Sequence, residues 1–397
     1  MLLKRIFILL LITALGACGC AHVQKAALKP GETEPVPVVI PSSGSTVTLA
    51  FVGDIMMGGS AAHKLKTEGP DSFFTYTAPL LKQADIVMGN LEGPLGLKGK
   101  QAKRKKFTFL VDPSAAEGLA RAGFKIMTLA NNHTMDFGVE ALQSTLAALG
   151  KQGLQHAGAG MNLSEARQPA WYQAKGKKVA VLAYSLTQPP SYWATEKRPG
   201  CAPAYNGQMK EDIEKAKDKG ADLVVVCCHW GKEKHTKLEW YQPNLAHLAI
   251  EAGADAVVCH HPHIWQELEV YQGKPIAYAI GNFAFGSLST STVNSGILYL
   301  SFDEKNRWAG GKILPLNVNN YQVRFAAQPM EEKKAGKFFD YLRDLSKSAD
   351  LSRNGIEITW KAPPFLPTPT PTVTPTPAAT PEPEDNPRGS VPGLTRP

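Results

Sequence analysis

Short apolar runs rich in β-branched residues recur along the middle of the chain, and amphipathic segments separate them. Helical periodicity is clearest at residues 139–149, whose apolar side chains fall near one face, and it returns at 245–250. Several of the runs are continuously apolar, as expected for strands that are covered on both faces. The runs lie at 47–52, 86–88, 126–129, 179–183, 223–226, 256–258 and 276–280. This alternation predicts a layered α/β fold with much parallel strand pairing.

The two ends of the chain depart from this pattern. Residues 1–20 combine a basic start, an apolar run and Leu15-Gly16-Ala17-Cys18, which predicts a lipoprotein signal peptide with Cys18 as the lipidated residue. An ordinary signal peptide is the alternative, and Cys20 is the weaker acylation candidate. We expect 21–45 to be a flexible tether, 46–362 the folded domain, and the Pro/Thr-rich segment 363–397 a disordered tail.

The formal net charge of +8 is partly concentrated in the basic run 103–106. Such a run is either a solvated loop or a patch that attracts phosphate, anionic lipid or a polyanion. Because no aromatic interleaving or nucleic-acid module accompanies it, we predict no nucleic-acid binding. The cysteines beyond the leader match no zinc knuckle, so they are buried side chains unless Cys227 or Cys228 forms a disulfide with Cys259.

Nearly every apolar run leads into polar side chains of the kind that bind metals. Because the carboxyl ends of parallel strands share one edge of a sheet, we expect these side chains to meet in one cleft. They are Asp54, Glu92, Asn131, Asn132, His133, His229, His260, His261, His263 and Asn282. Carboxylate, amide oxygen and imidazole together bind zinc, manganese or iron. The sequence therefore predicts a polar site that holds one or two divalent ions.

The same segments resemble the successive motifs of the CapA family of bacterial capsule (poly-γ-glutamate) synthesis proteins. The matching residues are Phe51 to Gly58, Asn90 to Leu95, Leu129 to His133 with Asp136 to Gly138, His229 to Gly231 with Glu233, Ala252 to Asp255, His260 to His263, and Gly281 to Phe283. They occur in the expected order and cover about residues 47 to 290.

This family is similar in turn to the calcineurin-like metallophosphoesterases, which implies a four-layer α/β/β/α sandwich. Three departures leave a single-metal or altered site as open as a two-metal one: Met56 stands where a histidine is expected, Glu92 where an aspartate is expected, and Cys259 where a glycine is common. The resemblance implies that His133 is a general acid and Glu92 a bridging-type carboxylate. The implied metal ligands are Asp54, Glu92, Asn132, His229, His261 and His263.

Further residues of these motifs are candidates for substrate binding: Asn131, Trp230, Glu233, His260 and Asn282. Trp230 is either a wall of the cleft or a packing residue.

Three functions remain open at this point. The first is a lipid-anchored protein on the extracytoplasmic face of a bacterial membrane, acting in synthesis, export or remodelling of an anionic capsular polymer, poly-γ-glutamate or a polysaccharide. Its expected partners are that polymer, the membrane through the N-terminal lipid, and membrane synthase or export proteins. The second is a free-standing metal-dependent hydrolase, either a phosphoesterase or an amidase. The third is a non-catalytic scaffold that binds polymer.

Overall fold

The computed structural model describes residues 46–103 and 105–364. The predicted signal peptide with Cys18, the tether and nearly all of the predicted tail lie outside the described residues. Within the described part, no helix is both long enough and apolar enough to cross a membrane.

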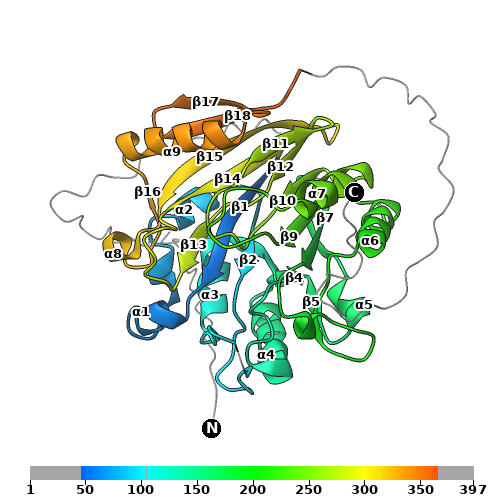
Figure 1. Cartoon of the computed structure of the whole chain (residues 1–397), viewed down its shortest axis with the longest axis vertical. Helices are drawn as coiled ribbons and strands as arrows, with labels where there is room; N and C mark the ends of the chain where they lie inside the picture. The colour runs from blue at the N-terminus through cyan, green and yellow to red at the C-terminus, as the bar shows by residue number, and fades with distance from the viewer. Residues whose placement is uncertain (1–45, 104, 365–397) are drawn as a thin grey trace, which may run out of the picture. The chain divides into compact units, whose positions relative to one another are not determined.

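The first sheet is centred on parallel strands and extended by antiparallel ones (Figure 1). Its parallel strands are β1 (Val47–Met56), β2 (Ile86–Leu91), β3 (Phe124–Thr128), β4 (Gln155–Ala157) and β13 (Asn282–Phe285). Its antiparallel strands are β14 (Asn294–Phe302), β15 (Trp308–Asn317), β16 (Gln328–Pro329), β17 (Asp350–Asn354) and β18 (Glu357–Lys361).

The second sheet has four parallel strands between two antiparallel edge strands. In sheet order these are β11 (Leu268–Tyr271), β12 (Lys274–Ala277), β10 (Ala256–Val258), β9 (Leu223–His229), β7 (Lys177–Ser185) and β6 (Ala170–Ala174). A short ladder pairs β5 (Ala159–Gly160) with β8 (Gly200–Cys201).

The helices are α1 (Ala62–Glu68), α2 (Ala78–Leu81), α3 (Ala115–Ala122), α4 (Gly138–Lys151), α5 (Leu163–Ala166), α6 (Asn206–Asp218), α7 (Tyr241–Glu251), α8 (Asn320–Val323) and α9 (Glu332–Leu345).

Alternating side chains of β9 show how the layers stack. Val225 packs in the core that the two sheets share, whereas its neighbours Val224 and Val226 pack with the apolar residues of α6 and α7. Every residue of β1 is buried, so both faces of the first sheet are covered there. Leu81 of α2 and Leu119 of α3 belong to the same core. These layers confirm the predicted α/β/β/α sandwich.

The predicted strands all form, one of them (256–258) with its predicted bounds and the others with shifted ends, but the antiparallel strands beyond residue 290 were not predicted. Strand β15 contains Gly310, Gly311 and Pro315, residue types that are poor strand formers. It forms because β14 and β18 pair with it on both sides. Pairing partners far away in the sequence therefore override the local propensity.

The four described cysteines are free and buried, so the predicted alternative of a disulfide is not formed. Cys228 and Cys259 lie on neighbouring strands or just beyond them, and the Cys259 sulfur accepts a hydrogen bond from the Cys228 backbone at 3.3 Å. They pack with apolar residues in the layer that α6 and α7 cover.

Candidate metal centre

The predicted ligands lie together where strands of the two sheets end. Asp54 lies near the end of β1, Glu92 follows β2, and His229 is the last residue of β9. A backbone bridge from His229 to His260 brings the segment after β10 beside them. All these residues are buried.

The surroundings of Glu92 give the clearest indication of a cation site. Its side chain is 0% exposed, and neither carboxylate oxygen has a hydrogen-bond partner among the described residues. Instead, Oε1 faces three imidazole Nε2 atoms, at 3.6 Å from His229 and 3.8 Å from both His133 and His263. Burial and the charge of Asp54 raise the pKa of Glu92 well above its usual range. A buried carboxylate without donors is costly, so its surroundings fit a cation.

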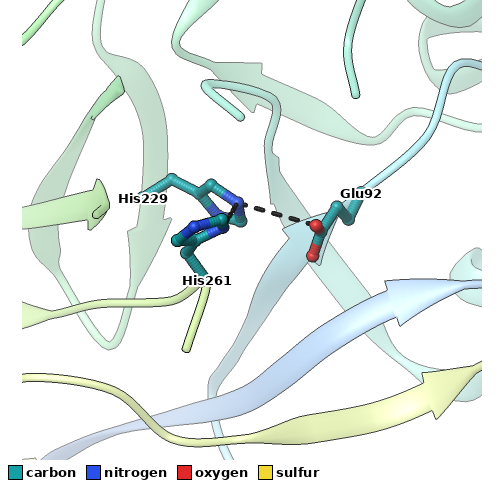
Figure 2. A group of neighbouring side chains, drawn as sticks. All are labelled: Glu92, His229 and His261. Carbon is teal, nitrogen blue, oxygen red and sulfur yellow. Dashed lines mark hydrogen bonds and ion pairs between the residues drawn. The ribbon is translucent and has the colours of Figure 1, made fainter. Parts of the chain in front are cut away.

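Two overlapping groups of ligand atoms surround Glu92. One consists of Asp54, Glu92 and His263, and the other of Glu92, His229 and His261, with the ligand atoms of each group within 4.8 Å of one another. Figure 2 shows the second group, with Glu92 facing the two imidazoles. Mixed oxygen and nitrogen donors of this kind suit a divalent transition metal. Glu92 is the residue that the two groups share.

In the first group, His263 balances the negative charge of the two carboxylates. His263 Nδ1 lies 3.0 Å from Asp54 Oδ2 and 2.9 Å from Asn282 Oδ1. Burial disfavours the imidazolium, but Glu92 and Asp54 outweigh it and raise the pKa of His263 to about 9. Two buried carboxylates thus favour a positive charge at this position, and the protonated imidazole of His263 provides that charge.

The second group is neutral apart from Glu92. His229 Nε2 lies 3.1 Å from His261 Nδ1 and 2.9 Å from Asn132 Oδ1. Burial lowers the pKa of His229 well below its usual range and that of His261 to about 3, so both imidazoles are unprotonated, the form that binds metals. Asn132 therefore places an amide oxygen next to this group.

Left-handed backbone aims two of the imidazoles into the site. His261 has φ +98° and His263 has φ +59°, values that residues other than glycine seldom adopt. Strain of this kind is found where the surrounding structure and a functional site demand it. Pro262 stands between the two histidines. The His263 ring lies beside Asp54 and Glu92, and the His261 ring lies beside His229 and Glu92.

Several candidates for substrate binding have other roles, which corrects the prediction. Trp230 is fully buried, and its indole Nε1 donates to the Tyr278 carbonyl at 3.0 Å, because it follows His229 and faces the opposite side of the sheet. His260 donates from Nε2 to the Val52 carbonyl at 3.1 Å. Asn131 donates to Asn90 Oδ1 at 3.0 Å, and its own Oδ1 accepts a hydrogen bond from the His133 backbone N–H at 3.0 Å. It therefore supports the loop that carries His133.

A pocket of about 490 Å³ opens the site to solvent. His133, His263 and Asn282 line this pocket together with Glu233, which is exposed. Apolar side chains line the same pocket: Phe107, Phe109, Phe285 and Leu288. The apolar lining was not predicted from the sequence, because Phe107, Phe109 and Leu288 lie in loops without periodicity and Phe285 ends the short strand β13.

Two further residues of the site were missed. Lys105 of the basic run is only 17% exposed, and it forms an ion pair with fully buried Asp136 at 2.5 Å. The run is therefore not uniformly a solvated loop or an anion-binding patch. Asp136 contacts His133, three residues earlier. Its place in the motif segment Asp136 to Gly138 was the available signal, but that segment was not assigned a role in the site.

Comparison with known proteins places these motifs in a family. The family model described as "Bacterial capsule synthesis protein PGA_cap" matches residues 48–287. The "PGA biosynthesis protein CapA" of Bacillus subtilis (strain 168) is 33% identical over 319 residues, which cover 80% of this chain and 82% of that protein. The "Capsule biosynthesis protein CapA" of Bacillus anthracis is 32% identical over 327 residues, covering 81% and 79% respectively.

Among solved structures, a putative 5'-nucleotidase from Staphylococcus aureus resembles the chain in part. Its TM-score is 0.40 at 16% sequence identity, and the match covers 66% of this chain and 52% of the nucleotidase.

Proposed function

Because the chain belongs to the family of bacterial capsule synthesis proteins, we propose that it is a divalent-metal-dependent hydrolase that remodels an anionic capsular polymer. The polymer that fits best is poly-γ-glutamate, and the bond cut is its amide. The observation that carries the proposal is the buried Glu92 carboxylate, which has no hydrogen-bond partner among the described residues and faces three imidazoles.

The residues that would hold the metal are those around Glu92. They are Asp54, Glu92, Asn132, His229, His261 and His263. When bound, a divalent ion supplies Lewis acidity at the oxygen of the reacting bond and favours ionisation of water. Hydrogen bonds fix the position of Asp54, since Asn90 Nδ2 donates to Asp54 Oδ1 at 2.9 Å and Asn131 in turn donates to Asn90.

His133 lies where a proton is needed. Its Nε2 points toward Glu92 Oε1, and the residue lines the pocket, so it faces both the ligand cluster and the space that a substrate would enter. Hydrolysis adds the hydroxyl of water to the carbonyl carbon, breaks the carbon–nitrogen bond, and releases from water one proton, which balances the proton taken up by the nitrogen. The departing nitrogen takes a proton, and His133 is the residue placed to donate it.

The pocket suits a polymer that alternates methylene groups with carboxylates. Phe109 and Phe285 offer apolar surface directly beside His133 and His263, at ring-centroid distances of 4.4 and 4.8 Å. Lys234 lines the same pocket, and the net charge of +8 favours the approach of a polyanion. These features support an acidic polymer over a neutral one.

The first test is cleavage of purified poly-γ-glutamate by the purified full-length chain. We expect shortened polymer and newly released amines, a rate that a chelator abolishes, and recovery on adding manganese, zinc or iron. His133→Ala should lower kcat by about 10²- to 10⁴-fold, the usual contribution of a general acid. Polymer size and amine release are measured in parallel with a generic phosphodiester.

Two results would argue against this proposal in different ways. Chelator-sensitive cleavage of the phosphodiester alone would indicate a phosphoesterase. Tight polymer binding without turnover on either substrate, unaffected by Asp54→Ala and His261→Ala, would indicate a scaffold.

We also propose that the protein is anchored by a lipid on Cys18 at the extracytoplasmic face of a bacterial membrane, where it would meet the polymer and membrane synthase or export proteins. In cells given an alkyne-labelled fatty acid, the full-length chain is expected to carry the label and to sediment with membranes. Cys18→Ala should lose both properties, because the thiol is the acylation site. Cys20→Ala is the matched control, and loss of label in this variant alone would assign the lipid to Cys20.

A further inference from the structure

We propose that Lys105 is a positioning residue of the reaction, which holds Asp136 and thereby aims His133 at the leaving group. This inference rests on the proposed function, because the role of His133 as proton donor belongs to it. What is new is a lysine from a separate loop, 28 residues before His133, as the residue that fixes the donor.

Asp136 is the centre of the arrangement. It is 0% exposed and accepts from four donors contributed by different segments. His133 Nδ1 lies 2.6 Å and the Phe109 backbone N–H donor 2.8 Å from Oδ2, while the Lys105 ammonium lies 2.5 Å and the Tyr192 hydroxyl 3.1 Å from Oδ1. A buried carboxylate that is satisfied in this way is a rigid anchor for the imidazole.

The Lys105 ammonium is enclosed by groups of the protein. It donates to Asp136 Oδ1 and to the Asn132 carbonyl, and its nitrogen lies 3.0 Å from His133 Nδ1. The ammonium also lies over the Tyr192 ring, 5.1 Å from its centroid. The residue therefore acts through His133 and Asp136 rather than by direct contact with a polyanion.

The contact to the Asn132 carbonyl extends this effect to the metal centre. Asn132 carries the amide oxygen beside His229, so one ammonium touches both the segment that holds a candidate ligand and the candidate proton donor. Lys105 thus fixes the position of the proton donor His133 relative to the candidate metal ligand Asn132. Without it, the buried Asp136 carboxylate would have one ionic partner fewer.

The experiment compares Lys105→Met with Lys103→Met, an exposed lysine of the same basic run, in the full-length chain. Two amides serve as substrates: poly-γ-glutamate, whose leaving group is an alkylamine, and γ-glutamyl-p-nitroanilide, whose weakly basic leaving group needs little protonation. We expect Lys105→Met to lower kcat on the polymer by about 10- to 100-fold with KM within about twofold, part of the full general-acid effect. On the anilide the loss should be at least about fivefold smaller.

Combination with His133→Ala separates positioning from a general structural effect. If Lys105 acts through His133, the double variant should be no slower than His133→Ala alone. Equal losses on both substrates, or losses that multiply in the double variant, would overturn the proposal. Metal content and melting temperature are measured for every variant, and Lys105→Arg, which keeps the charge, should recover part of the activity if the methionine variant folds poorly.

A readout without turnover keeps the inference separate from the proposed function. Hydrogen–deuterium exchange over residues 131–137 should increase in Lys105→Met and stay unchanged in Lys103→Met. Unchanged exchange in Lys105→Met would refute the positioning role. Increased exchange in a chain that cleaves neither amide would leave the anchoring of His133 intact and reject only the hydrolase.

Discussion

Glu92→Gln is expected to empty the metal centre and, at the same time, to stabilise the metal-free protein. Glu92 is common to both groups of candidate ligands, so neutralising it removes the shared charge from each. Metal affinity should fall by more than about 100-fold, since even supporting residues around a ligand contribute about 10- to 100-fold. Elemental analysis of the purified variant measures this loss.

The gain in stability without metal has a separate cause. In chelator, wild-type Glu92 is a buried carboxylate without hydrogen bonds among the described residues, and glutamine removes that charge while keeping the shape. We expect the free energy of unfolding to increase by about 1 to 3 kcal/mol, the usual cost of an unsatisfied buried group. Denaturant titrations of both proteins in chelator test the change.

The same titrations should depend on pH in a defined direction. Burial and Asp54 raise the pKa of Glu92 in the folded state, so the folded protein binds this proton more tightly than the unfolded chain. The destabilisation is therefore small at low pH and grows as the pH rises above the ordinary range of a glutamate. In Glu92→Gln this dependence should be weaker.

Glu233→Gln is the matched control, because Glu233 lines the same pocket but is exposed. It should leave metal content and stability unchanged. A Glu92→Gln protein that keeps its metal, or that is less stable than the wild type in chelator, would contradict our assignment of Glu92.

Gly53→Ala is expected to have the largest effect on folding. A Cβ at this position would lie 2.1 Å from the Gly281 carbonyl oxygen and 2.6 Å from its carbon, both backbone atoms. These atoms are fixed, since Gly281 accepts the Asp54 backbone N–H at 2.9 Å and β13 pairs with β1 at this point. We expect a loss of about 3 kcal/mol or more in the free energy of unfolding, at or above the upper end for overpacked sites.

The strands that would be pushed apart carry Asp54 and Asn282, so Gly53→Ala should also weaken metal binding. Gly150→Ala in helix α4 is the control, because no heavy atom beyond the adjacent residues and the backbone of its own helix lies within 4 Å of its Cβ position. It should raise stability by about 0.5 to 1 kcal/mol, as alanine favours a helix over glycine. Equal stability of the two variants in denaturant unfolding would contradict the close approach of β1 and β13.

Most of the layered fold could be predicted because its parallel strands are continuously apolar. The runs at 47–52 and 223–226 are buried on both faces. Strands buried in this way are apolar at successive positions, which is visible in the sequence. The antiparallel strands β14 to β18 could not be predicted in the same way. Their stability depends on partners far away in the chain. In β15, the glycines and the proline also weaken the local sequence signal of a strand.

The amino-acid sequence by itself determined which residue types follow each strand, and that was enough to predict Asp54, Glu92, His229 and His261 as neighbours. Parallel strands bring their carboxyl ends to one edge whatever the loops do. Only the tertiary structure decided which way each side chain faces and which loops meet. Trp230 is turned into the core beside His229, and Lys105 reaches Asp136 from a separate loop. Such contacts depend on packing between distant segments, which local sequence patterns do not record.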